Sequence, residues 1–291
     1  MKLQRETKNR PMTGSVTRIR QGRAFVVGIT LVIVGICLVW FPSVAQRFTA
    51  NVQARVGEEY VLIANHESEQ RYERAVEANE AGDYSRALAQ LTLEGTDAIA
   101  RVRIPGLGVN LPVYASADDK DLARGAGWLP GTSPPVGGNG THGVITAHSG
   151  MRTHRMFDPL PKVKKGDLIY IDVLGQALTY RVTSTTVDVP QTGTRNLHPQ
   201  PGQDLLTLVT CTPYGVNTHR LLVTAQRTET SAQNAEAQIT KDAIGGARQQ
   251  IAKTLLVVPV VGGVALLVGL AAHRRRRALG PVRRVLPKKR H

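Results

Sequence analysis

Hydrophobic and polar positions divide the chain into two apolar runs with a long mixed segment between them. The runs Ala24–Phe41 and Thr254–Ala272 contain no charged residue. A helix of about 20 apolar residues crosses the hydrocarbon core of a bilayer. Trp40 ends the first run beside Phe41, and no small-x-small cleavage site follows directly, which favours a retained anchor over a cleaved signal peptide. We therefore predict transmembrane helices at residues 24–42 and 254–272.

Residues 43–97 have the pattern of an extracellular helical region. An apolar residue recurs every four positions, which predicts a helix with one apolar stripe, formed by Val44, Phe48, Val52, Val56 and Tyr60. The charged, alanine-rich stretch Glu67–Glu80 continues or restarts the helix. Gly82-Asp83 interrupts it, and Tyr84–Leu93 predicts a further short helix.

From about Ala98 the pattern changes to short β-type runs separated by turn residues. The predicted strands are Arg101–Ile104, Val109–Tyr114, Gly143–Ala147, Leu168–Val173, Leu178–Val189, Leu205–Cys211 and Arg220–Gln226. Many strands with little helix between them indicate an all-β barrel or sandwich over residues 98–228. Residues 229–253 are polar and rich in alanine and glutamine, which is typical of a linker.

The net charge of +15 lies entirely at the two ends of the chain. Residues 1–23 carry a net +6 and residues 273–291 carry +9, so the part between them is formally neutral. Basic residues beside a membrane span stay in the cytoplasm. The sequence thus predicts two basic cytoplasmic tails, a two-pass protein of the cell membrane and an extracellular domain. A domain that binds nucleic acid normally carries positive charge on its own surface. Here the positive charge lies only on the two tails, so a nucleic-acid partner is excluded.

Only two cysteines are present, Cys37 in the first apolar run and Cys211 at the end of a strand-like run, so a disulfide framework is not indicated. Cys211 is followed by Pro213, and Arg220 opens the next apolar run. Two strands joined by the loop 212–219 would place Cys211 and Arg220 side by side. A guanidinium there could hold an oxyanion.

His148 is the third candidate, because it too ends an apolar run and precedes a glycine turn. A nearby imidazole favours the thiolate form of a cysteine, so the three residues could form an acyl-transfer centre. By spacing alone, a structural cysteine is as good an interpretation, and other histidines compete for the role of base: His142, His154, His198 and His219. Zinc is a poor alternative because only one cysteine is available.

The stretch from Thr207 to Val223, TLVTCTPYGVNTHRLLV, resembles the signature of sortases, specifically the class C, pilin-polymerising type. Three further stretches match in the same order along residues 99–227: Ile104-Pro105 with Asn110–Tyr114, Gly131–Gly138, and Thr141-His142 through Ala147–Gly150. A second, C-terminal span also resembles class C rather than the single-anchor sortases.

This resemblance implies an eight-stranded sortase barrel and a cysteine transpeptidase. Cys211 would attack the Thr–Gly bond of an LPxTG-like sorting signal on a surface or pilin protein and form a thioacyl enzyme. His148 would protonate the leaving amine and deprotonate the incoming one, and Arg220 would stabilise the oxyanion. The acceptor would be a pilin lysine, and the resemblance implies no cofactor and no metal.

One feature departs from the class C pattern, and two rival functions stay open. Class C sortases usually carry a lid with an Asp-Pro-aromatic motif ahead of the barrel, which residues 67–98 lack; Asp83-Tyr84 could substitute. The first rival is a housekeeping sortase that joins surface proteins to a cell-wall precursor. The second is a non-catalytic membrane adaptor whose barrel binds peptides.

Overall fold

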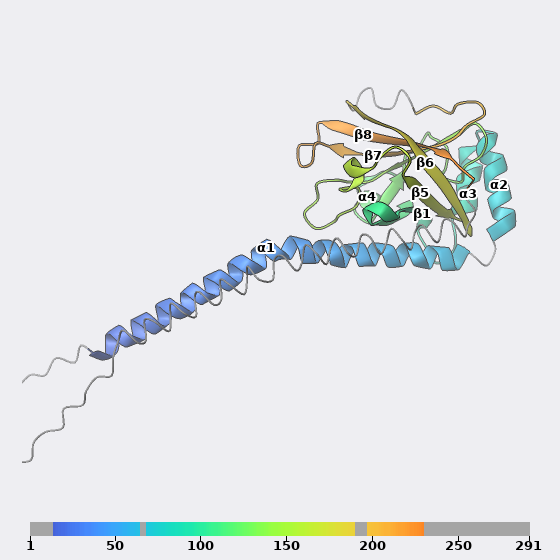
Figure 1. Ribbon diagram of the computed structural model, residues 1–291. Coiled ribbons are helices and arrows are strands. Elements are labelled where there is room, and N and C mark those ends of the chain that lie inside the picture. The colour runs from blue at the N-terminus through green and yellow to red at the C-terminus, as the bar shows by residue number, and fades with distance from the viewer. Residues whose placement is uncertain (1–13, 65–67, 190–196, 230–291) are drawn as a thin grey trace, which may run out of the picture. The chain divides into compact units, whose positions relative to one another are not determined.

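The computed structural model describes residues 14–64, 68–189 and 197–229. Three helices come first in the chain and eight strands follow (Figure 1). The helices are α1 (Gly14–Ala64), α2 (Ser68–Glu80) and α3 (Tyr84–Leu91). The strands are β1 (Ala98–Ile104), β2 (Val109–Tyr114), β3 (Ala126–Trp128), β4 (Thr141–Thr146), β5 (Leu168–Val173), β6 (Gln176–Asp188), β7 (Asp204–Thr212) and β8 (His219–Arg227). Short helical turns lie between strands: η1 (Pro105–Leu107), α4 (Asp119–Leu122) and η2 (Leu160–Lys162).

The eight strands form a closed barrel in the order β1-β2-β3-β4-β7-β8-β6-β5. The pairs β2–β3 and β4–β7 are parallel, and β5–β6, β6–β8 and β7–β8 are antiparallel. The predicted eight-stranded barrel is therefore confirmed, and among the described strands closure leaves no unpaired sheet edge. The barrel interior is filled mainly by β-branched and leucine side chains, including Val102, Val113, Ile145, Ile169, Ile171, Leu208 and Val223.

Strand β3 is the one strand that the hydrophobic pattern did not predict. It has only three residues and contains Gly127, which lowers its β-propensity. A Cβ at Gly127 would lie 2.1 Å from the Ser116 carbonyl oxygen, so the tight approach of two backbones requires glycine there. This strand closes the barrel between β2 and β4 through long-range pairing that local periodicity does not record.

The helix predicted after the first apolar run is confirmed as the C-terminal part of α1, but only the end of its predicted apolar stripe, at Tyr60, faces the barrel. Tyr60 is buried, and its hydroxyl accepts a hydrogen bond from the Leu174 N–H at 3.1 Å. Gly57 approaches the barrel so closely that a Cβ would meet Arg101 Cδ at 2.7 Å. In contrast, Val44, Phe48 and Val52 are exposed. Part of the barrel surface beneath the helix is charged, and Gly57 leaves room there for the Arg101 side chain.

That charged surface is an ion triad on strands β1 and β5. Asp172 accepts hydrogen bonds from Arg101 Nε at 2.7 Å and from Arg103 Nε at 2.6 Å, and Arg103 Nη2 bonds its other oxygen at 2.7 Å. Asp172 is the register partner of Arg101. All three side chains are largely buried. The shared carboxylate neutralises much of the charge beneath α1.

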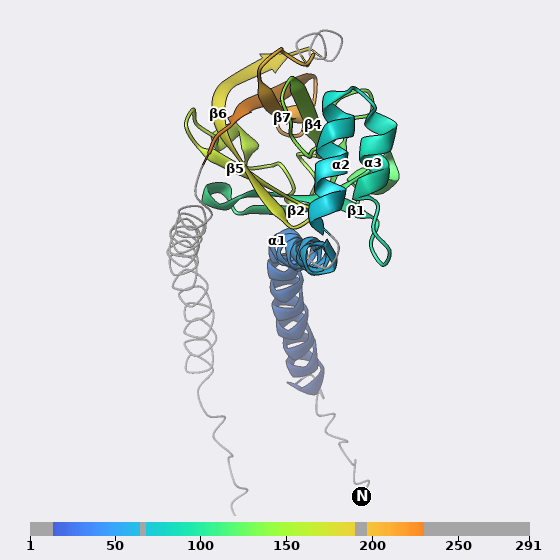
Figure 2. The same ribbon diagram turned by 90° about the vertical axis from the view of Figure 1, so that its right-hand side faces the viewer.

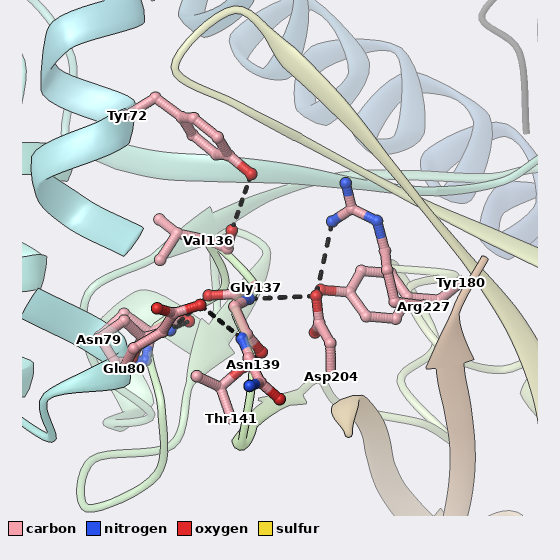
Figure 3. Close-up of polar contacts among 12 residues, drawn as sticks. Tyr72, Asn79, Glu80, Val136, Gly137, Asn139, Thr141, Tyr180, Asp204 and Arg227 are labelled. Atoms are coloured by element: carbon pink, nitrogen blue, oxygen red, sulfur yellow. Dashed lines mark hydrogen bonds and ion pairs between the residues drawn. The ribbon is translucent and has the colours of Figure 1, made fainter. Parts of the chain in front are cut away.

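Helices α2 and α3 follow the predicted pattern, with the break at Gly82 in a left-handed conformation at φ +76°. Helix α2 docks on the loop before β4 (Figure 3). Asn79 Nδ2 donates to the carbonyl oxygens of Pro134 and Gly137, at 3.2 and 2.9 Å, and Glu80 accepts from the Asn139 N–H at 2.6 Å. These bonds hold the helical region against the barrel.

The same loop is tied to β7 through Asp204 (Figure 3). Asp204 accepts from the Gly138 N–H at 3.1 Å and from the Tyr180 hydroxyl at 2.9 Å. Burial raises the pKa of Asp204, even though these bonds and Arg227, 3.7 Å away, oppose the shift. Asp204 begins β7, so this network lies at the opposite end of that strand from Cys211.

By length and composition, the part Ile33–Ala64 of α1 could cross a membrane, and it overlaps the first predicted span, 24–42, at residues 33–42. It begins at Gly14, so helix already includes the second half of the predicted basic tail 1–23. The predicted second span at 254–272, the tail 273–291 and nearly all of the linker 229–253 lie outside the described residues.

Candidate active site

Cys211 and Arg220 lie opposite each other on neighbouring strands. Strand β7 carries Cys211 near its C-terminal end, and β8 carries Arg220 near its start. The two residues are direct partners in the antiparallel register. Side chains of directly paired residues point to the same face of a sheet, with Cβ atoms about 4.5–5.5 Å apart. The predicted juxtaposition of these two residues is therefore present.

His148 reaches the same end of the barrel from the other side of β7. Strand β4 runs parallel to β7, so both strands end at one edge. After β4 the parallel contact continues, because the Ala147 N–H donates to the Val209 carbonyl at 3.2 Å and Thr210 Oγ1 donates to the Ala147 carbonyl at 2.8 Å. Ser149 Oγ then donates to the Cys211 carbonyl at 2.6 Å. His148 stands between these two anchored residues, beside the end of β7.

Cys211 and Arg220 thus lie on β7 and β8, and His148 lies just after the end of β4, which is the other neighbour of β7 in the barrel. Neighbouring strands lie about 4.8 Å apart, so Cys211 on the middle strand has Arg220 on one side and the segment with His148 on the other. Each of them is partly exposed, which leaves the group open to a ligand at this end of the barrel. An apolar cluster on the same three strands and the adjoining loops supports it, formed by Val144, Leu197 and Leu222 with Leu129 and Val209 packed against them.

Two loops pack against each other beside the candidate residues. Gly150, just after His148, has φ +82°, and a Cβ there would lie 3.1 Å from the Gly215 nitrogen in the β7–β8 loop. Arg220 Nη1 donates to the carbonyls of Asn217, at 3.2 Å, and His219, at 3.1 Å, which ties the guanidinium to that loop. The close approach at Gly150 explains why a glycine follows the His-Ser pair.

The loop after His148 is also closed on itself. The Phe157 N–H donates to the His148 carbonyl at 3.1 Å, and the Gly150 N–H donates to Asp158 Oδ1 at 2.7 Å. Burial raises the pKa of Asp158, with the bond from Gly150 opposing the shift. These contacts fix the backbone on both sides of the candidate histidine.

The competing histidines have other surroundings. His142 is fully buried near the start of β4, where its ring contacts Thr207 Oγ1 at 2.7 Å and the His198 carbonyl at 3.1 Å. Burial lowers the pKa of His142. His219 precedes Arg220 on β8, and since successive strand residues point to opposite faces, it faces away from Cys211. His154 lies in the loop after His148, where its ring contacts Thr153 Oγ1.

Three supporting residues were not predicted from the sequence. Ser149 and Thr210 tie the segment after β4 to the end of β7, and Asp158 accepts from the Gly150 N–H within the loop after His148. Ser149 directly follows His148 and Thr210 directly precedes Cys211, so their position beside a candidate residue was the sequence signal that could have found them. Asp158 lies ten positions after His148, and nothing in the local sequence pattern indicated its hydrogen bond with the Gly150 N–H. Among the described residues, no cluster of histidine, cysteine or acidic side chains could hold a metal ion.

The pair Asp83-Tyr84 caps a helix. The Asp83 carboxylate accepts from the Arg86 N–H at 3.0 Å as the N-cap of α3. The Tyr84 hydroxyl accepts from Ser133 Oγ at 3.3 Å. Ser133 bridges to Gly143, five residues before His148, and Gly143 pairs with Leu206 on β7. These contacts anchor the start of α3 to the segment that precedes β4.

Comparison with known proteins identifies the class. Residues 102–228 match the family model of the sortase domain. Sortase A of Bacillus anthracis is 28% identical over 213 residues, which cover 71% of this chain and 95% of that protein. The solved structure of Streptococcus pneumoniae sortase C is 34% identical with a TM-score of 0.56, covering 61% of this chain and 98% of that one. A lid mutant of sortase A from Corynebacterium diphtheriae is 39% identical with a TM-score of 0.53, covering 57% and 96%.

The chain belongs to the sortase family, and its barrel is the sortase fold. It is a cysteine transpeptidase that acts on sorting signals, as the family match implies. The structural relatives include several pilus-related sortases C, in agreement with the class C resemblance of the Cys211–Arg220 stretch.

Proposed function

We propose that this chain polymerises pilins, cleaving an LPxTG-like sorting signal through a thioacyl intermediate on Cys211 and joining it to a pilin lysine. The observation that supports the proposal is that Cys211 and Arg220 are register partners on β7 and β8, and that the backbone on both sides of His148 is bonded to β7 at the same end of the barrel. A thiol, an imidazole and a guanidinium are the groups that acyl transfer through a cysteine requires.

In the first half-reaction, the Cys211 thiolate attacks the carbonyl carbon of the sorting-signal threonine. The negative charge moves to the carbonyl oxygen, where Arg220 stabilises it. The Thr–Gly C–N bond then breaks, and His148 gives a proton to the leaving glycine amine. The acyl group remains on sulfur as a thioester.

In the second half-reaction, the neutral ε-amine of a pilin lysine attacks the thioester carbonyl. His148 takes a proton from the attacking nitrogen, the C–S bond breaks, and Cys211 leaves as a thiolate. The product is an isopeptide bond between two pilin chains. The proton that His148 gives up in the first half-reaction is regained in the second, and the reaction needs neither a cofactor nor a redox change.

Residues 98–228 form the catalytic domain in this proposal, and residues 43–97 form the helical region that joins it to the first span, 24–42. A second span at 254–272 would return the chain to the cytoplasm, with tails 1–23 and 273–291 on that side. The resulting extracellular position of the barrel suits substrates that are exported surface proteins.

The alternative acceptor is a cell-wall precursor, and the relatives favour neither acceptor by name, since they include both sortases A and sortases C. The two functions differ in the bond that is made. Mass spectrometry of surface polymers from cells with the wild-type chain should reveal threonine-to-lysine isopeptides between pilin subunits. Cells with Cys211→Ala should lack them, and a product containing only wall-precursor linkages would contradict the pilin proposal.

A further inference from the structure

The part of α1 beyond Pro42 has a barrel-facing side made of small and polar residues. Gln46, Thr49, Gln53, Gly57 and Tyr60 lie on this side, and all five are buried or partly buried. Gln53 and Gly57 are among the fully buried ones. The barrel and helices α2 and α3 lie on one side of this part of α1 (Figures 1 and 2).

The opposite side of the same segment is a continuous exposed apolar stripe. Phe41, Val44, Phe48 and Val52 are 64, 60, 70 and 46% exposed. At 3.6 residues per turn, the centre of this stripe lies roughly 140° around the helix from the centre of the barrel-facing side. Four large apolar side chains at i, i+3, i+7 and i+11 form a patch of the kind that marks an interaction surface.

The position of the stripe in the chain indicates the bilayer as its partner. It begins at Phe41, the last residue of the uncharged run, so it directly continues the apolar sequence of the first predicted span. The exposed Arg47 and Arg55 accompany it, as basic residues do on helices that lie in the interface of anionic membranes. Glu58 and Glu59 follow, and the apolar pattern stops there.

A bend allows the segment to leave the direction of the span. Helix α1 bends partway along its length (Figure 1), and Pro42 lies inside it. Proline removes one helical hydrogen bond and clashes with the preceding turn, which kinks a helix. The helix can therefore cross the membrane up to Phe41 and then turn toward the membrane plane.

The barrel-facing side of this segment touches the loop that follows His148. Gln46 Nε2 donates to the carbonyls of Met151, at 3.4 Å, and Arg152, at 3.3 Å, and Thr49 Oγ1 donates to the Thr153 carbonyl at 2.7 Å. These two residues of α1 thus connect the stripe to the candidate active site. One helix diameter, about 10 Å, separates the stripe from the loop.

We propose that residues 43–55 of α1 form an interfacial helix whose stripe, Val44, Phe48 and Val52, inserts into the outer membrane leaflet. In this position of the helix, the loop after His148 lies about one helix diameter above the lipid, at the height where a membrane-anchored substrate is presented. The insertion itself does not depend on the reaction; the benefit to transfer rests on the proposed transpeptidase function.

Insertion is tested with the full chain in vesicles of phosphatidylglycerol and phosphatidylethanolamine. A benzoylphenylalanine replaces Phe48 in one sample and Val187, an apolar barrel residue that is 61% exposed, in a control. After irradiation, position 48 should carry a phospholipid adduct by mass, and position 187 should not. Adducts of position 48 with protein, either a second copy or another segment of this chain, or with neither lipid nor protein, would overturn the proposal.

The consequence for the site is tested with Val44→Ser, Phe48→Ser and Val52→Ser combined in the full chain. Transfer from a lipid-anchored sorting peptide in the same vesicle should fall at least about tenfold, because the site loses its effective concentration at the surface. Cleavage of a soluble sorting peptide should stay unchanged. Leu62→Ser is the matched control, because Leu62 is 69% exposed on the same face of α1 but lies beyond Glu58 and Glu59, and it should change neither rate.

The two assays distinguish a failure of the proposed membrane insertion from a failure of the proposed reaction. If wild type cleaves neither peptide, the proposed reaction is wrong, while the lipid adduct at position 48 still decides the insertion. If the triple variant loses soluble-peptide cleavage as strongly as lipid-anchored transfer, the stripe does not act by positioning the site at the membrane, and that part of the proposal fails.

Discussion

Cys211 and Arg220 are direct register partners across the β7–β8 pair, on the same face of the sheet. The hairpin between them fixes this relationship, since the antiparallel ladder continues from Leu205 paired with Gln226 up to Thr212 paired with His219. The guanidinium is tied in turn to the loop through the carbonyls of Asn217 and His219. A thiol and a forked cation are therefore held side by side by backbone pairing.

Arg220→Lys should be strongly impaired although it keeps the positive charge. Lysine lacks the planar fork, so it cannot both bond the loop carbonyls and face an oxyanion. Loss of one oxyanion donor costs about 10²–10³ in rate. The rate of thioacyl formation on a sorting peptide measures this directly, and a lysine variant within a few-fold of wild type would show that Arg220 contributes charge alone or nothing.

Gly150→Ala should lower both stability and transfer. Its φ of +82° strains any residue with a Cβ, and that Cβ would lie 3.1 Å from the Gly215 nitrogen, which would displace the β7–β8 loop. Gly131→Ala is the matched control, because Gly131 has φ +89° and open space around the Cβ position. Both variants should lose about 1–2 kcal/mol of unfolding free energy.

Only Gly150→Ala should also slow peptide cleavage at a temperature where both variants are folded. Equal activity of the two variants, measured under those conditions, would show that the packing of the two loops does not matter for the site.

His142 should make the barrel less stable at mildly acidic pH. Burial lowers the pKa of His142 in the folded state, so the unfolded chain binds the proton more readily. Stability is then fully present above the unfolded pKa, near 6.5, and is lost as the pH falls through and below it. In His142→Gln, which can still bond Thr207, the decrease in Tm between pH 7.5 and pH 5.5 should be smaller. An unchanged pH dependence would contradict the assignment.

Asp172→Asn should destabilise the region where α1 meets the barrel. The substitution leaves Arg101 and Arg103 largely buried without their shared carboxylate. Breaking a buried ion pair by removing one partner costs about 3–5 kcal/mol. The comparison is Asp97→Asn, which removes a carboxylate 73% exposed that pairs with Arg124. That change should cost about 1 kcal/mol or less. Thermal unfolding of both variants measures the loss of unfolding free energy, and equal losses in the two variants would contradict this account.

Much of the fold could be predicted because its signals are local. Seven of the strands have apolar runs bounded by turn residues, and the helix break at Gly82 has a backbone conformation that glycine favours. Strand β3 could not be predicted in this way, since its three residues form a strand only because they pair with β2 and β4. The side of α1 that contacts the barrel was also not predictable, because it depends on the charged surface formed by Arg101, Arg103 and Asp172.

The candidate site shows the same division. Cys211 and Arg220 could be placed together from one hairpin, since only eight residues separate two strand-like runs. Placing His148 beside them needs the parallel β4–β7 pair, which joins segments more than sixty positions apart and is not visible in local periodicity. The resemblance to sortases supplied that link. The contact of Gln46 and Thr49 with the loop after His148 joins positions still further apart.

The most direct test of the account is the intact mass of the protein after mixing with an LPxTG peptide. Wild type should gain the mass of the acyl fragment, and Cys211→Ala should gain nothing, because the thioester forms on that sulfur. His148→Ala should form the adduct at least about 10²-fold more slowly. His142→Ala and His219→Ala should retain acylation whenever they are folded. An adduct on Cys211→Ala, or a wild-type rate in His148→Ala together with an inactive but folded His142→Ala, would contradict the assignment of the reaction centre.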